Sequence, residues 1–401
     1  MYFFRLLAAA AAFLVVSNSA HARPQILVDA DRAIVLAHTD AFQRWHPASI
    51  TKLMTAYVIF RAIKAGEITL ESPVRVSKNA LSNPPSKMGL PEGTILNFDN
   101  ALKMLIVKSA NDIAVAIGES LSGTESAFVA RMNQTAKQIG MLDTNFVNPH
   151  GLHHDLQYTT ARDMAVLAIA LHREFPQYGP LFRIKRIRHG KAILKSHNPL
   201  TERFSGSDGF KTGYICAGGY NLVGSATRNG RRLVTVVLGA THPSKRAVRA
   251  GKLLTEGFDG TLKSATPLAN FRPYGANRKN AISIRDEVCS RKKRKTAKRE
   301  TRKKRRARLK RELERREAEE ALYLTPPVRT QEPVRVVLGG AFGPSPVGIR
   351  VANGATPPPY IAVPKPRPDY QLARIDDLPP FSTGEKGKKA IPPRFRPTLT
   401  N

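Results

Sequence analysis

The chain has 401 residues and a formal net charge of +33, from 64 Lys and Arg against 31 Asp and Glu. This excess of positive charge excludes an acidic, self-repelling protein, and only two cysteines exclude a disulfide-dense scaffold. With 42% hydrophobic and 7% aromatic residues, the composition predicts one ordinary folded domain plus chain that does not bury a core.

The N-terminus has the pattern of an export signal. An apolar run at residues 6–16 follows Arg5, and Ala20-His21-Ala22 places small residues at the two positions that a signal peptidase reads. We therefore expect a signal peptide at residues 1–22, cleavage before Arg23 and a periplasmic location. The run is too short to span a membrane comfortably.

Residues 23–265 alternate between strand-like and helix-like patterns. Hairpins are predicted where β-branched runs flank short polar turns, at 25–38, at 184–193 and at 219–240. Helices are predicted from apolar periodicity and end signals, at 49–65, 100–121 (one or two helices), 126–139, 160–173 and 244–257. Strands at both ends with helices between them predict an α+β fold, an antiparallel sheet flanked by helices with a helical subdomain.

The composition changes after this domain. Residues 266–290 are interpreted as a linker, and 291–320 as a basic segment that can form a helix. Residues 321–401 contain more than half of the 29 prolines and are predicted to be a disordered, Pro-rich tail. The basic segment favours an anionic membrane surface or an acidic wall polymer as partner, or serves as a solvated spacer.

Three short motifs carry residues with catalytic chemistry. In Ser49-Ile50-Thr51-Lys52, the hydroxyl and the amine lie three residues apart and share one helix face. A neutral lysine can take the proton from a serine nucleophile, and burial or a second cation lowers a lysine pKa toward that state. Free N–H groups at the helix start can stabilise an oxyanion.

The second motif is Ser109-Ala110-Asn111, in which the serine can relay a proton and the amide can orient Lys52. The third, Lys211-Thr212-Gly213, is placed at the start of a strand. Lys211 and Thr212 can bind a terminal carboxylate, and Gly213 lets a substrate backbone approach the strand. The Tyr214 N–H can complete an oxyanion hole with that of Ser49.

The order and spacing of these motifs resemble those of penicillin-binding proteins and serine β-lactamases. Further blocks are similar to the serine-type D-alanyl-D-alanine carboxypeptidases of the peptidase S11 family: residues 46–56, 108–112, 146–152, 160–163, 209–214, 217–223 and 236–239. The resemblance implies acylation of Ser49 by a peptidoglycan stem peptide, release of the last D-Ala, hydrolysis by water, and slow acylation by penicillin. It implies neither a metal nor another cofactor.

Two alternatives within this fold are a β-lactamase and a DD-endopeptidase. Ala110 stands where class A β-lactamases usually carry Asp, and no Glu-x-x-Leu-Asn stretch lies between Asn111 and Lys211. A different class, a basic polyanion-binding protein, is suggested by the net charge and opposed by the signal peptide; we do not expect nucleic acid as a partner. The two cysteines, Cys216 and Cys289, leave two possibilities, a disulfide or two buried thiols.

Overall fold

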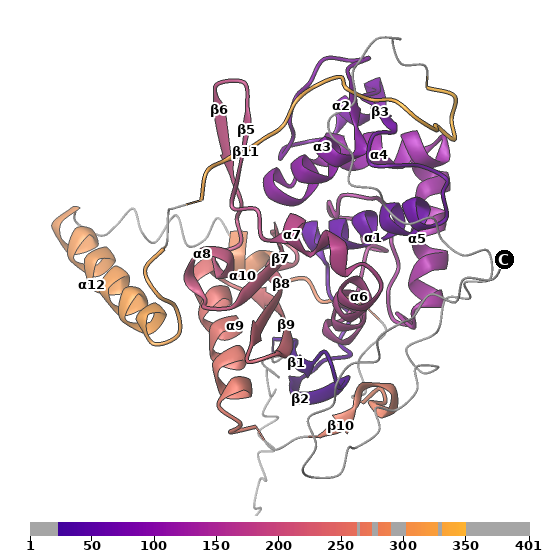
Figure 1. The fold of residues 1–401 in the computed structure, drawn as a ribbon. Helices are drawn as coiled ribbons and strands as arrows, with labels where there is room; N and C mark the ends of the chain where they lie inside the picture. The colour runs from indigo at the N-terminus through magenta and orange to yellow at the C-terminus, as the bar shows by residue number, and fades with distance from the viewer. Residues whose placement is uncertain (1–22, 263–264, 275–279, 290–301, 328–330, 350–401) are drawn as a thin grey trace, which may run out of the picture.

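The structure is a computed structural model that describes residues 23–262, 265–274, 280–289, 302–327 and 331–349 (Figure 1). The predicted signal peptide, the start of the basic segment and the end of the tail lie outside these residues. Within them, no helix is both long enough and apolar enough to cross a membrane.

A six-stranded antiparallel sheet forms the centre of the fold, in agreement with the predicted fold class. Its order is β10 (Thr266–Pro267), β2 (Ile34–Thr39), β1 (Gln25–Asp29), β9 (Arg231–Ala240), β8 (Gly219–Arg228) and β7 (Ser207–Ile215). The predicted turn between β8 and β9 contains Asn229 and Gly230, both with positive φ. This conformation joins two strands by the tightest kind of hairpin.

Helices cover both faces of this sheet (Figure 1). Alternate residues of the strands face two cores, because side chains alternate across a strand. One core lies under α9 (Pro243–Phe258) and the other under α6 (Ala161–Glu174) and α1 (Lys52–Lys64). The second core continues into a helical cluster built from α2 (Lys78–Ser82), α3 (Phe98–Lys103), α4 (Asn111–Ser122) and α5 (Glu125–Gln138).

Short elements connect this framework. They are η1 (Ala48–Thr51), β3 (Pro73–Arg75), β4 (Ile95–Asn97), η2 (Met104–Lys108), η3 (Pro176–Tyr178), α7 (Gly179–Phe182), β5 (Arg186–His189), β6 (Ala192–Lys195) and α8 (Leu200–Arg203). The region predicted as one or two helices at 100–121 is divided in two. The π-helical turn η2 ends at Ser109, whose φ of 63° is left-handed, and α4 starts afresh at Asn111.

The segment 266–290 is not a free linker, and that expectation has to be corrected. Thr266 and Pro267 extend the sheet as β10, and η4 (Leu268–Asn270) follows. The side chains of Leu268, Phe271 and Ile284 are buried. The segment packs onto the domain because burying these apolar side chains away from water is favourable in free energy.

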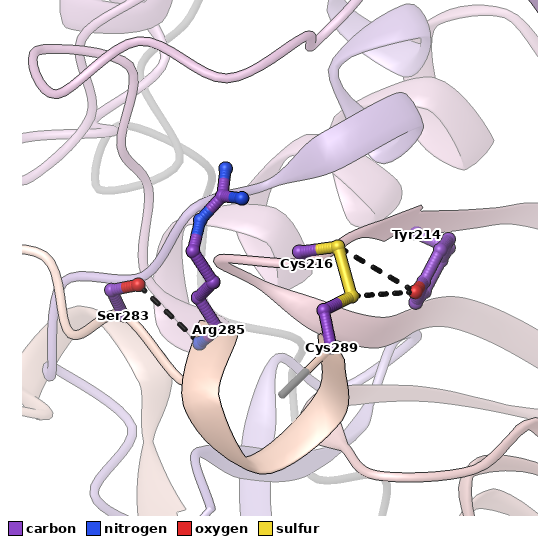
Figure 2. Close-up of a disulfide and its surroundings, with 5 residues drawn as sticks. All are labelled: Tyr214, Cys216, Ser283, Arg285 and Cys289. Atoms are coloured by element: carbon purple, nitrogen blue, oxygen red, sulfur yellow. Dashed lines mark hydrogen bonds between the residues drawn. A yellow bond between two sulfur atoms is a disulfide. The ribbon is translucent and has the colours of Figure 1, made fainter. Parts of the chain in front are cut away.

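Cys216 and Cys289 form a disulfide that ties this segment to the sheet (Figure 2). Cys216 follows the last residue of β7, and Cys289 ends α10 (Arg285–Cys289). The main-chain N–H of Ile284 also donates to the carbonyl of Ala217. The bond resolves the two possibilities left by the sequence in favour of the disulfide.

Replacing both cysteines by alanine should lower the free energy of unfolding by about 4 kcal/mol, because the bond closes a loop with a sequence separation of 73 residues. Urea unfolding of the double variant measures this change. Wild-type protein unfolded in the presence of a thiol reductant should show the same loss. Equal stability of the variant and the oxidised wild type would contradict the prediction.

The basic segment is helical where it is described, as predicted. Helix α12 (Arg302–Ala321) lies beside α9, where Arg203 pairs with Glu320 and the side chain of Arg316 contacts His242. Leu324, just beyond the helix, is buried in the core under α9. The second half of α12 is thus attached to the domain that contains the main sheet.

The Pro-rich tail is ordered in its first part, so the expectation of disorder from residue 321 has to be corrected there. Strand β11 (Val334–Arg335) pairs in parallel with β5, and the side chain of Val336 is buried. Further along, the N–H groups of Gly339 and Phe342 donate to Ile95 and Glu71. We call residues 331–349 the strap, because they cross from β5 to the helical cluster (Figure 1).

A chain that ends at Pro327 should be less stable than one that ends at Arg350, by about 2 kcal/mol. The expected loss follows from exposing the contacts of Val336, a valine that is 2% exposed. The urea midpoints of the two truncated proteins measure the difference. Identical midpoints would show that the strap contributes nothing to stability.

Candidate active site

Ser49 lies in the turn η1, directly before helix α1. Ala48 has a positive φ of 52°, and a Cβ on Gly151 would lie 1.9 Å from the Ala48 carbonyl oxygen. Only glycine fits at this contact, because the loop after α5 packs directly against the turn that carries Ser49. The Ser49 Oγ is 3.1 Å from the Nζ of Lys52, the first residue of α1.

Lys52 is fully buried, and its amine is surrounded by oxygen atoms. Besides Ser49, its Nζ lies 2.8 Å from Asn111 Oδ1 and 2.7 Å from the carbonyl oxygen of His150. Burial lowers the pKa of Lys52 well below its usual value, and the charge of Lys211 lowers it further, against an opposing effect of Asp112. The site therefore favours a neutral amine beside the serine hydroxyl.

The second motif lies between η2 and α4, against the same amine. The left-handed conformation of Ser109 turns the chain so that Asn111 begins α4 facing Lys52. The Asn111 amide nitrogen donates to the carbonyl of Pro84, which sets which atom of the amide faces the lysine. Asn111 is thus positioned to orient Lys52, while the Ser109 side chain lines the cavity described below.

We expected the third motif at the start of a strand, but it lies in the second half of β7. Lys211 and Thr212 are buried, and Tyr214 is half-exposed. A Cβ on Gly213 would lie 2.7 Å from the Ser49 main-chain nitrogen, so β7 passes directly beside η1. Burial, followed by the charge of Arg246, lowers the pKa of Lys211 to about 7.

A cavity of about 490 Å³ connects the three motifs. Its lining includes seven of the eight predicted site residues: Ser49, Ser109, Asn111, Lys211, Thr212, Gly213 and Tyr214. The eighth, Lys52, lies beneath Ser49 and contacts it. The structure thus brings together all the residues predicted from the sequence, although they come from three separate parts of the chain.

The cavity also contains residues that were not among the predicted site residues. Arg246, in the first turns of α9, is buried and adds a second cation near Lys211. Its guanidinium donates to the carbonyl of His197, which also lines the cavity. The family resemblance placed a carboxylate-binding residue near Ser244 or Arg246 without fixing which, so neither was among the predicted site residues. The packing of α9 shows that Arg246 reaches the site. The sequence could not indicate the contact with the His150 carbonyl, because every residue has a main-chain carbonyl group.

This arrangement is suited to nucleophilic chemistry on a carbonyl group. A hydroxyl lies beside a buried amine that can accept its proton, and the buried cations Lys211 and Arg246 line the same cavity. Such a site belongs to the serine hydrolases that use a lysine as base.

Comparisons with known proteins identify the family within this class. The model of the peptidase S11 family, described as D-alanyl-D-alanine carboxypeptidase, matches residues 11–242. The D-alanyl-D-alanine carboxypeptidase DacC of Escherichia coli is 37% identical over 275 residues, which are 67% of this chain and 68% of that protein. DacA of Haemophilus influenzae is 35% identical over 273 residues, covering 66% of this chain and 69% of that protein.

Solved structures agree with this assignment. The crystal structure of penicillin binding protein 5 from Haemophilus influenzae matches with a TM-score of 0.57 and 35% identity, over 60% of this chain and 71% of that one. Penicillin-binding protein D2 from Listeria monocytogenes, solved in its cefotaxime-bound form, matches with a TM-score of 0.54 and 28% identity, over 59% of this chain and 97% of that one. The chain belongs to the peptidase S11 family of D-alanyl-D-alanine carboxypeptidases, and it is a peptidase.

Proposed function

We propose that this chain removes the terminal D-alanine from peptidoglycan stem peptides through an acyl-enzyme on Ser49. The observation that carries the proposal is the buried Lys52, whose Nζ lies 3.1 Å from the Ser49 hydroxyl and whose pKa is lowered by burial and by Lys211. The family assignment supports the reaction, and the geometry supports the roles of the residues.

In the first step, the Ser49 Oγ attacks the carbonyl carbon of the penultimate D-alanine, and Lys52 accepts the hydroxyl proton. The main-chain N–H groups of Ser49 and Tyr214 stabilise the oxyanion that forms. Lys211, Thr212 and Arg246 hold the terminal carboxylate of the substrate, since two buried cations and a hydroxyl lie together at that end of the cavity.

In the second step, the C–N bond to the terminal D-alanine breaks, and a proton passes from Lys52 through the Ser109 hydroxyl to the leaving amine. Water then hydrolyses the ester on Ser49, with Lys52 again taking a proton. Penicillin acylates Ser49 in the same way, and its ester is hydrolysed slowly.

Mass spectrometry of the penicillin adduct tests this proposal. Digestion of the labelled protein should place the added mass on the peptide that contains Ser49, and Ser49→Ala should show no adduct. Release of free D-alanine from a pentapeptide should be lost in the same variant. Adduct on another residue, or D-alanine release that survives in Ser49→Ala, would refute the mechanism.

Product analysis separates the alternatives. Cleaved cross-links would identify a DD-endopeptidase, and rapid turnover of penicillin would identify a β-lactamase. Salt-dependent binding to polyanions without acylation of Ser49 would identify a basic binding protein.

We further propose that residues 1–22 direct export, that residues 23–265 form the catalytic domain, and that the enzyme works in the periplasm. The basic segment 291–320, which includes most of α12, would hold it near an anionic surface of the cell envelope. Membrane fractionation of the expressed protein, with and without residues 291–401, tests this location.

A further inference from the structure

A second, three-stranded sheet stands beside the active site. It consists of β6, β5 and β11 of the strap, so it combines the hairpin at 186–195 with a segment from much later in the chain (Figure 1). On one face of this sheet Ile187, Leu194 and Val334 pack against the main core. Strands β5 and β6 also contact η2, the turn that leads into Ser109.

The other face of this sheet carries only basic and apolar side chains. Arg186 lies opposite Lys195, and Arg188 lies between Ile193 and Arg335. Paired residues of neighbouring strands share a face, so these four cations lie together. We call them the cationic face: Arg186, Arg188, Lys195 and Arg335.

Like charges directly opposite each other destabilise a sheet, so this arrangement costs stability. No acidic residue occurs between residues 175 and 201, and the one acidic residue of the strap, Glu332, lies before β11. In the part of the chain that the structure describes, Arg188, Lys195 and Arg335 are exposed and take part in no salt bridge. A surface with three cations that have no acidic partner is suited to bind an anionic ligand.

The cationic face lies close along the chain to a residue of the active-site cavity. Lys195 ends β6, and His197, two residues further on, lines the cavity together with Lys211 and Arg246. We therefore expect a ligand on this face to lie near a substrate whose scissile bond is at Ser49.

We propose that the cationic face binds the anionic stem peptides of polymeric peptidoglycan that neighbour the peptide being cleaved. This inference rests on the proposed function and adds a distinction between polymeric and small substrates. A stem peptide carries free carboxylates, and only a polymer presents further carboxylates while one of its peptides occupies the cavity. A cationic surface next to a site raises the rate at which an anionic substrate arrives.

The test compares two triple variants of the full-length mature protein. Arg188→Gln, Lys195→Gln and Arg335→Gln together neutralise the cationic face. The control carries Lys78→Gln, Lys137→Gln and Lys252→Gln, three exposed lysines that do not line the active-site cavity and that remove the same charge. D-Alanine release is measured on a soluble acyl-D-Ala-D-Ala peptide and on purified pentapeptide-rich sacculi, at low and at high salt.

At low salt, the face variant should lose about tenfold in kcat/KM on sacculi and stay within twofold of wild type on the soluble peptide. The control variant should match the wild type on both substrates, and salt should reduce the difference on sacculi. Equal losses on both substrates, or no loss on sacculi, would overturn the inference.

A binding measurement separates this inference from the proposed function. Ser49→Ala protein should sediment with sacculi, and adding the three face substitutions should weaken this binding more than adding the three control substitutions, even if no D-alanine release is found for any form. Binding to vesicles that contain anionic phospholipid, lost in the face variant while binding to sacculi persists, would assign the face to a membrane and overturn the inference.

Discussion

Replacing Lys52 by alanine should reduce the rate of acylation by penicillin by at least about 100-fold and up to about 10,000-fold, the range expected for loss of a general base. The reason is geometric, because the Lys52 Nζ contacts the Ser49 hydroxyl directly. Lys52→Arg should be equally inactive, because a guanidinium keeps its proton. Stopped-flow acylation with a fluorescent penicillin measures the rate.

The pH dependence of the wild-type enzyme tests the same assignment without a mutation. Lys52 must be neutral to accept the proton, so kcat/KM should fall as the pH drops below the lowered pKa of this lysine. Lys211 must be charged to hold the carboxylate, and its pKa is about 7 in the free enzyme, so kcat/KM should also fall above that pH. The profile should therefore be bell-shaped.

Because Lys52 is buried, its replacement can destabilise the fold. The melting temperature of the Lys52→Ala protein is the control for this effect. A Lys52→Ala protein that folds and still acylates within about threefold of the wild-type rate would exclude Lys52 as the base.

Gly213→Ala should reduce acylation by about 100-fold or more, although only one methyl group is added. The new Cβ would lie 2.7 Å from the Ser49 nitrogen and 3.0 Å from the Ile50 nitrogen. These are main-chain atoms, so β7 and η1 have to move apart. That movement separates the N–H groups of Ser49 and Tyr214, and loss of one oxyanion donor costs about 100- to 1,000-fold.

Gly179→Ala is the matched control, because no atom lies within 4 Å of the Cβ position at Gly179. Its acylation rate should equal that of the wild type. The second-order rate constant with penicillin and the melting temperature should be measured for both variants. Wild-type acylation by Gly213→Ala would show that the close contact between β7 and η1 has no part in catalysis.

Local patterns in the sequence predicted much of the framework. Alternating apolar residues located both hairpins of the main sheet, and Asn229-Gly230 marked the turn of the second. Apolar periodicity located α5, α6 and α9 to within one residue and α1 to within three, since the predicted start at Ser49 falls in η1. These predictions succeeded because hairpin turns and amphipathic helices are encoded by neighbouring residues.

Composition was a poorer guide to the end of the chain. Its prolines suggested disorder throughout residues 321–401, yet Val334 and Val336 of the strap pack against the main core. A proline-rich average conceals a short apolar stretch, and such a stretch becomes ordered when a complementary strand edge is available. That edge belongs to β5, more than a hundred residues earlier in the chain.

Ser49 and Lys52 could be predicted as catalytic groups from the sequence alone, because they are three residues apart and the chemistry of each motif is carried by its residue types. The folded structure was needed to show that the Asn111 oxygen and the His150 carbonyl complete the surroundings of the Lys52 amine, that Arg246 reaches the cavity, and that Cys216 pairs with Cys289. These contacts join residues far apart in the chain. Their formation depends on how the helices and the sheet pack, which no local pattern encodes.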